Sequence, residues 1–197
     1  MTITTSNQTG TMNGPGSMNR PKVLVLTGVE NAGKTATAEA LAAKTGWPLI
    51  LEFARTHPDV LDAAVTPSTL QALHALWQEA ITTMKTDAPW IICDTGPLVL
   101  ELWSEEVFGE GLSSAAQAFD PSEGVALFVL CETLEHWHPD PLRNLPRHAD
   151  RKALEEKYLA RLQGLAIDGT SHIQLPGTWA LKSRVEHVLN AASQIIS

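Results

Sequence analysis

Short apolar runs alternate with longer segments of helical periodicity along this chain. Five of the runs read as buried strands: Lys22–Thr27, Pro48–Leu51, Trp90–Cys93, Val125–Cys131 and His172–Leu175. Runs without polar alternation are typical of strands covered on both faces of a parallel sheet. The helical pattern predicts helices at Lys34–Lys44, from the N-cap Ser68 to Lys85, at Pro97–Phe108, from the cap Asp150 to Gln163, and from Thr178 or Trp179 to Ile195. The order predicts an α/β fold with helices on both faces of a five-stranded parallel sheet.

A phosphate-binding pattern follows the first strand at once. The loop Gly28-x-x-x-x-Gly33-Lys34-Thr35 matches G-x-x-x-x-G-K-[ST] in full, and it opens a helix as the pattern requires. In such loops the backbone N–H groups and the helix N-terminus hold phosphate, while the lysine reaches the β- and γ-phosphates and the hydroxyl contacts Mg²⁺. We therefore predict the P-loop NTPase fold, a three-layer αβα sandwich that binds ATP and Mg²⁺. The predicted nucleotide contacts are Gly28, Glu30, Asn31, Ala32, Gly33, Lys34, Thr35 and Ala36.

Carboxylates stand at the ends of the second and third strands, where ligands bind in folds of this class. Asp94 is predicted to face the metal or the phosphoryl acceptor, although a helix N-cap is the alternative. Glu52 is predicted to take a proton from a substrate hydroxyl or to hold the substrate. Arg55 pairs with Glu52 or binds a substrate anion in this interpretation. The alternative for both is a surface ion pair of little energetic weight. Glu30 either contacts the substrate or is solvated.

Composition narrows the class of partner. The chain has 197 residues and a formal net charge of −8, which argues against sequence-independent binding of nucleic acid. No apolar run approaches the roughly 18 residues of a membrane helix. Cys93 and Cys131 lie in apolar runs and read as reduced core thiols, which suits the cytoplasm. Residues 1–20 are predicted to be a disordered tail before a single domain, residues 21–197. The sequence leaves open whether the protein forms a homo-oligomer.

Four segments in order resemble a known family. GVENAGKT, EFAR, ICDT and the Trp-x-x-Asp-x-Leu-Arg segment are similar to the kinase domain of the bifunctional NadR proteins, over about Val23 to Leu189. These proteins are ribosylnicotinamide kinases grouped with AAA-type P-loop ATPases. Two departures are Asn31 and Ala32, where the family loop usually has serines. The nucleotidyltransferase domain of the full-length family enzymes is not expected in this chain.

The resemblance implies roles for individual residues. Lys34 and Thr35 would hold ATP and Mg²⁺, and Asp94 would lie near the metal and the acceptor hydroxyl. The remaining implied site residues are Glu52 and Arg55 near the acceptor, Asp140 and Arg143 in a lid segment, and Gln78 facing the substrate.

The loop between Glu132 and His148 is predicted to be this lid. Arg143 and Arg147 are the candidates for an arginine that stabilises the transferring phosphoryl group. Trp137 either stacks on a base or anchors the lid on the core. His136, His138 and His148 lack the spacing of familiar zinc sites and read as polar loop residues. Gly177, after the fifth strand, is assigned to adenine binding by analogy of fold, and the helix at Arg151–Arg161 reads as a solvated face.

These observations predict an ATP- and Mg²⁺-dependent kinase of a small, nucleoside-like acceptor, with the resemblance pointing to ribosylnicotinamide. Lys34, Glu52, Asp94 and Arg143 form its predicted catalytic group. The alternative is a regulatory P-loop ATPase that acts as a switch with a protein partner. A missing acceptor pocket beside Glu52 would favour the switch.

Overall fold

A five-stranded parallel sheet forms the centre of the molecule. The computed structural model describes residues 20–115, 120–167 and 170–196, so most of the predicted tail lies outside the described residues. The sheet order is β2-β3-β1-β4-β5. The bounds of its strands are Lys22–Thr27 (β1), Leu49–Ile50 (β2), Trp90–Asp94 (β3), Val125–Cys131 (β4) and Ser171–Leu175 (β5). The predicted αβα sandwich is confirmed.

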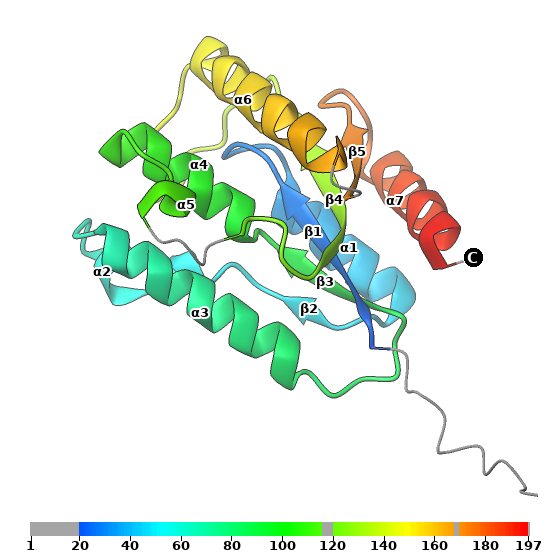
Figure 1. Ribbon diagram of the computed structural model, residues 1–197. Helices are drawn as coiled ribbons and strands as arrows, with labels where there is room; N and C mark the ends of the chain where they lie inside the picture. Colours follow the sequence, from blue (N-terminus) through cyan, green and yellow to red (C-terminus); the bar gives the residue numbers. More distant parts are fainter. Residues whose placement is uncertain (1–19, 116–119, 168–169, 197) are drawn as a thin grey trace, which may run out of the picture.

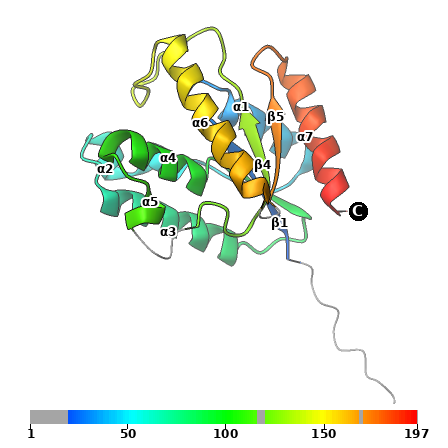
Figure 2. The ribbon, with the colours of Figure 1, turned by 45° about the horizontal axis from the view of Figure 1, so that its top comes forward.

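Helices cover both faces of this sheet (Figures 1 and 2). One layer holds α1 and α7, which contact each other, and the other holds α3, α4 and α6. The helical bounds are Lys34–Thr45 (α1), Phe53–Thr56 (the 3₁₀ helix η1), Pro58–Leu61 (α2), Pro67–Thr83 (α3), Pro97–Phe108 (α4), Leu112–Ala115 (α5), His148–Ile167 (α6) and Leu181–Ile196 (α7). Within the described ranges, no helix combines the length and the apolarity that crossing a membrane requires.

Some boundaries differ from the predicted ones for local reasons. Helix α3 begins at Pro67 rather than after Ser68, because Thr66 and Thr69 form a reciprocal capping box. Strand β2 keeps two of the four predicted residues, since it is an edge strand that pairs only with β3. Helix α7 begins at Leu181 because Trp179 N–H donates to the carbonyl of Pro176 in a turn. The short helices η1, α2 and α5 have no counterpart in the prediction.

The core is built from strands that are buried along nearly their whole length. Leu24, Val25 and Leu26 in β1 have no exposed surface, and β3 and β4 flank them with residues of the same kind. Because the strands are parallel, their carboxyl ends all lie at one edge of the sheet. The segments that follow β1, β2, β3, β4 and β5 therefore meet there, and this edge holds the candidate site.

A buried carboxylate holds the turn from α4 to α5. Glu101 is 1% exposed and accepts hydrogen bonds from the backbone N–H of Ser113 (2.9 Å), from its hydroxyl, and from Arg161 in α6 (3.4 Å). Gly111 passes directly over this carboxylate: a Cβ there would lie 2.4 Å from Glu101 Oε1. In contrast, a Cβ at Gly164, inside α6, would meet nothing within 4 Å.

These two glycines predict stability changes of opposite sign. Gly111→Ala should lower the free energy of unfolding by about 1–3 kcal/mol, because Glu101 must leave its partners. Gly164→Ala should raise it by up to about 1 kcal/mol through helix propensity. Urea unfolding followed by circular dichroism measures both. Equal midpoints for Gly111→Ala and the wild type would contradict the assigned contact.

Candidate active site

The phosphate loop takes the bent path that its sequence predicts. Gly28 has φ 123°, and a Cβ on it would lie 2.5 Å from the carbonyl oxygen of Cys131. Gly33 has φ 79° and stands just before α1. Lys34 Nζ donates to the carbonyl oxygens of Gly28 (2.9 Å) and Val29 (2.8 Å), so its ammonium group lies across the inside of the loop. Only glycine has the conformational freedom and the absent side chain that both bends require.

The structure brings Thr35 and Asp94 together at the foot of this loop. The Thr35 hydroxyl donates to Asp94 Oδ2 at 2.7 Å. Asp94 is 2% exposed, and its other oxygen, Oδ1, is buried with no hydrogen-bond partner among the described residues. The alternative reading of Asp94 as a helix cap fails, because Gly96 is the N-cap of α4 and no side chain of the described residues caps that helix.

The residues at this foot suit a magnesium ion. A hydroxyl and a carboxylate are hard oxygen ligands, and Mg²⁺ takes few protein ligands when it also binds phosphates and water. The unpartnered Oδ1 of Asp94 supplies the negative group that a cation would satisfy. Helix α1 has no side-chain cap within the described chain, which leaves its first N–H groups available to phosphate.

An ion-pair cluster lies at the same edge, between the end of β2 and the lid (residues 132–147). Arg55 donates to Glu52 Oε2 at 3.0 Å and to Asp140 Oδ2 at 3.1 Å. Burial by itself lowers the pKa of Arg55, but the hydrogen bond to Asp140 and the charges of Glu52, Asp140 and Asp94 outweigh it and raise that pKa. Asp94 therefore lies within the electrostatic field of the cluster. The predicted residues Glu52, Arg55 and Asp140 are brought together.

The lid lies against the phosphate loop through the side chain of Glu30. This carboxylate accepts hydrogen bonds from the backbone N–H groups of Asn144, at 3.0 Å, and Leu145. The sequence left Glu30 open between a substrate contact and solvation, and in the structure its carboxylate contacts the backbone of the lid. It tethers the lid.

A second tether runs from Asn31, which has φ 57°. Its amide donates to the carbonyl of His136 at 2.7 Å and accepts from the backbone N–H of His138 at 3.1 Å. Arg143 also donates to Asn31 Oδ1 at 3.2 Å, and its guanidinium group lies 4.0 Å from Asp140. Arg143 is therefore held beside the phosphate loop, as the lid prediction requires.

The base of the lid rests on a buried arginine of α6. Arg151 has no exposed surface, and its guanidinium carbon lies 5.0 Å from the ring centre of Trp137. Arg143 lies 5.9 Å from the same ring. Trp137 thus anchors the lid on the core in this structure. Arg151 also donates to the carbonyl oxygens of Leu134, Leu145 and Pro146.

The prediction of a solvated helix was wrong for one side of α6, and a buried arginine of α7 was missed. The sequence does carry a signal for these buried charged residues: they are spaced three and four positions from apolar residues, on the same side of the helix. The buried stripes are Arg151, Glu155, Tyr158 and Leu162 in α6, and Arg184, Val188 and Ala192 in α7. A charged residue inside such a stripe indicates a specific buried partner.

Three predicted residues lie differently from expectation. Gln78 donates to Glu123 at 2.8 Å, just before β4 begins, so it belongs to the opposite edge of the sheet and the structure does not bring it to the site. Arg147 pairs with Asp150 at 2.7 Å and its side chain is 80% exposed. Gly177 packs against the start of the lid.

The packing of Gly177 against the lid requires a glycine, since a Cβ at position 177 would lie 2.2 Å from the carbonyl oxygen of Thr133. Ala36 is exposed in the first turn of α1. Among the described residues no three His, Cys, Asp or Glu side chains gather into a metal-binding group, and the lid histidines are no exception.

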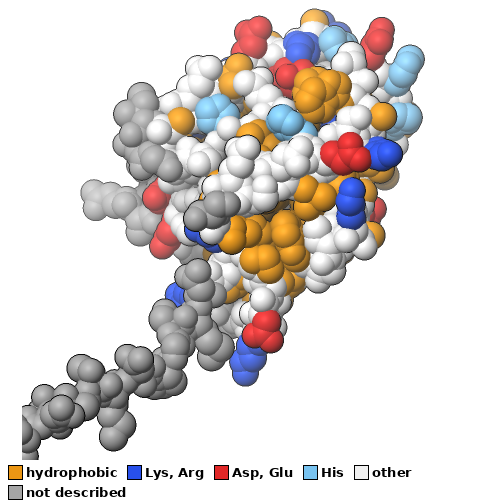
Figure 3. Space-filling model, turned by 90° about the vertical axis from the view of Figure 1, so that its right-hand side faces the viewer, with side chains coloured by type: hydrophobic (Ala, Val, Ile, Leu, Met, Phe, Trp, Pro, Cys, Tyr) orange, Lys and Arg blue, Asp and Glu red, His pale blue; other side chains and the backbone are white. Residues whose placement is uncertain are grey.

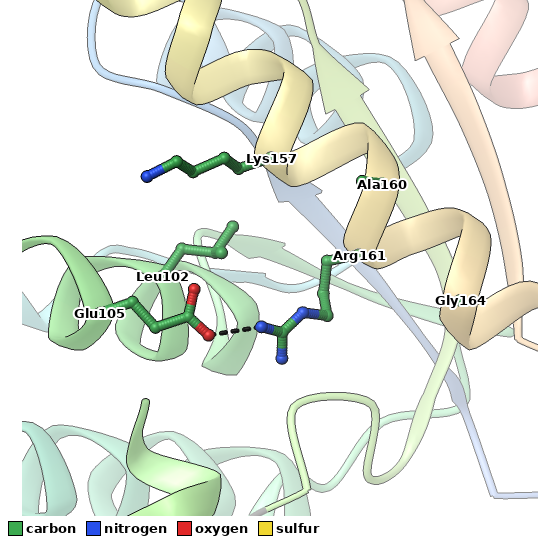
Figure 4. Close-up of a pocket in the computed structure, with 6 residues that line it drawn as sticks. All are labelled: Leu102, Glu105, Lys157, Ala160, Arg161 and Gly164. Atoms are coloured by element: carbon green, nitrogen blue, oxygen red, sulfur yellow. Dashed lines mark hydrogen bonds and ion pairs between the residues drawn. The ribbon is translucent and has the colours of Figure 1, made fainter. Parts of the chain in front are cut away.

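A pocket of about 320 Å³ lies away from this site, between α4 and α6 (Figure 4). Leu102, Lys157 and Gly164 are among its lining residues, and an ion pair between Glu105 and Arg161 crosses it. Because α6 starts at the lid and runs toward the amino edge of the sheet, its last turns are far from the phosphate loop. This pocket is not part of the candidate active site.

The surface shows no gathering of basic side chains on the face in Figure 3, where lysines and arginines are scattered among acidic residues. Hydrophobic side chains collect near the middle of that face.

A family model described as an AAA domain matches residues 23–180. The chain belongs to this family. The match includes the phosphate loop, Glu52, Asp94 and the whole lid. No curated protein sequence matches the chain.

Solved structures share the fold at low sequence identity. The NadR protein in complex with NR superposes with a TM-score of 0.65 and 16% identity, over 90% of this chain and 52% of that one. A deoxyadenosine kinase from M. mycoides with dCMP and dCDP gives 0.60 and 10%, over 88% and 99%. The YorR protein from Bacillus subtilis, in complex with phosphorylated GDP, gives 0.55 and 12%, over 87% and 96%. The chain thus spans about half the length of the NadR chain.

The Glu30 tether predicts a measurable change in lid protection. Glu30→Ala should speed amide hydrogen exchange at Asn144 and Leu145 by roughly ten- to a hundredfold, because hydrogen bonds to a charged group contribute about 1.5–3 kcal/mol. Exchange mass spectrometry on peptides covering residues 142–148 measures it. Glu39→Ala, an exposed carboxylate of α1, is the control. Unchanged exchange in the Glu30 variant would mean that the tether is not formed in solution.

Proposed function

We propose that this protein transfers a phosphoryl group from ATP, with Mg²⁺, to a hydroxyl of a small nucleoside-like molecule, ribosylnicotinamide being the first candidate. The observation that carries the proposal is the placement of Thr35–Asp94 and Glu52–Arg55–Asp140 at one edge of the sheet, under one lid. The structural likeness to NadR and to a deoxyadenosine kinase supports this class of acceptor, at the level of fold.

The phosphate loop would hold the triphosphate through backbone N–H groups and Lys34. The ammonium of Lys34 now contacts two neutral carbonyl groups, and phosphate oxygens are stronger, charged acceptors for it. Thr35 and Asp94 would hold Mg²⁺. When bound, this ion would offset the negative charge on the transferring phosphoryl group.

Glu52 is the better placed of the two carboxylates to take the acceptor proton. Asp94 is buried and engaged by the Thr35 hydroxyl, whereas Glu52 is only partly buried and faces the lid. The contact with Arg55 limits the rotation of the Glu52 side chain. Asp140, bound to the same guanidinium, would bring the lid into contact with the acceptor.

The lid would then exclude water from the transfer. Arg143 lies beside Asn31 of the phosphate loop, where its charge can offset the charge that develops on the phosphoryl group. Exclusion of water suppresses hydrolysis of ATP and strengthens these interactions.

A test of the reaction is ADP release from ATP and Mg²⁺ with a panel of nucleosides that includes ribosylnicotinamide. Strong stimulation by one nucleoside, with the phosphorylated product seen by mass spectrometry, is the expected result. Lys34→Ala should abolish it. Slow hydrolysis that no nucleoside changes would instead support an ATPase switch and overturn the kinase proposal.

Substitutions of Glu52 and Asp94 should change different kinetic parameters. Glu52→Gln should lower kcat by about 10²- to 10⁴-fold, the range of general-base catalysis, with little change in the Mg²⁺ concentration for half-maximal rate. Asp94→Asn should raise that Mg²⁺ concentration. Steady-state kinetics at varied Mg²⁺ separates the two effects, and normal rates in both variants would refute both assignments.

A further inference from the structure

A buried arginine of α7 reaches the back of the phosphate loop. Arg184 is 3% exposed, and its NH1 group donates to the carbonyl oxygen of Ala32 at 2.8 Å. Its NH2 group donates to the carbonyl of Pro176 at 3.0 Å. The same NH1 would lie 3.1 Å from a Cβ at position 33, so any side chain there would crowd the guanidinium group.

The charge of this arginine has no anionic partner within 4 Å among the residues that the structure describes. None of the ion pairs among residues 20–115, 120–167 and 170–196 involves Arg184. Burial raises the pKa of the Cys131 thiol to about 11, and the charges of Arg184 and Lys34 both oppose that rise. The positive charges of Arg184 and Lys34 therefore both reach the end of β4, where the phosphate loop bends. A buried cation without a carboxylate is costly unless a ligand supplies the anion.

The bond to Ala32 also fixes the direction of a peptide. In a planar trans peptide the C=O and the next N–H point in opposite directions. Because Arg184 holds the Ala32 carbonyl from behind, the N–H of Gly33 in the same peptide points the opposite way, away from Arg184. Gly33 N–H is one of the donors that a loop of this pattern offers to phosphate.

We propose that Arg184 is a positioning residue for the polyphosphate. It aims the Gly33 N–H at the phosphates, adds a positive charge behind the loop, and ties the loop to the Pro176–Gly177 segment after β5. This inference rests on triphosphate binding in the proposed function and is independent of the acceptor. Because Arg184 acts on the polyphosphate, the affinity for inorganic tripolyphosphate, which has no base and no acceptor, should depend on this residue.

The experiment measures the Kd of Mg²⁺-tripolyphosphate by isothermal titration calorimetry for the wild type, Arg184→Lys and Arg184→Gln. Lysine keeps the charge and one donor, and glutamine keeps a donor without the charge. We expect Gln to weaken binding by about tenfold or more, the size of a charge-assisted hydrogen bond, and Lys to restore a large part of the loss. Circular dichroism melting shows whether each variant is folded.

Arg161→Gln is the matched control. It removes an arginine that bridges α4 and α6 through Glu101 and Glu105, far from the loop, so it should lower Tm and leave the Kd unchanged. A folded Arg184→Gln variant with wild-type Kd, or a folded Lys variant no better than Gln, would overturn the assignment. If the Lys variant does not fold, the comparison of Gln with the wild type decides. A wild type that binds no tripolyphosphate would remove both this inference and the proposed function, whereas binding without nucleoside phosphorylation would remove only the latter.

Discussion

The path of the phosphate loop depends on one close approach, that of Gly28 to the end of β4. With 2.5 Å between the position of a Cβ at Gly28 and the carbonyl oxygen of Cys131, the loop must leave β1 in a bend that only glycine permits. Strand β1 lies between β3 and β4, so the same bend sets the start of α1 beside Asp94. A side chain at position 28 would displace the loop from both neighbouring strands at once.

The phosphate-binding pattern of the loop leaves some of its side chains available for contacts with other segments. Phosphate is bound through backbone N–H groups, so the identities of residues 29–32 are not fixed by it. Here Glu30 and Asn31 use that freedom to hold the lid. The phosphate loop and the lid are therefore in direct contact, and a shift of the loop backbone would be carried to Arg143 without any intermediate element.

Local pattern predicted much of the architecture and little of the lid. Strands β1 and β4 have the predicted bounds, because continuous apolar runs buried on both faces are unambiguous. The edge strand β2 and the helix η1 depend on tertiary contacts, and so do the lid contacts, which join residues more than a hundred positions apart. Gln78 was assigned by the resemblance to a family glutamine on the long helix, and an error of a few turns in the register there moves a side chain from one edge of the sheet to the other.

The net charge of −8 is compatible with the proposed polyphosphate ligand, because a few cations lie at the phosphate loop although the chain as a whole is acidic. Lys34, Arg143 and Arg184 all contact the loop through carbonyl or amide oxygens, which are weaker partners than carboxylates. Arg143 also lies 4.0 Å from Asp140, whereas no ion pair of the described residues involves Lys34 or Arg184. The charges of these two side chains are therefore available to an anion, and the desolvation of Arg184 has already occurred on folding. A ligand that supplies this anion would offset that cost, so the proposed phosphate binding would be coupled to the stability of the folded chain through Lys34 and Arg184.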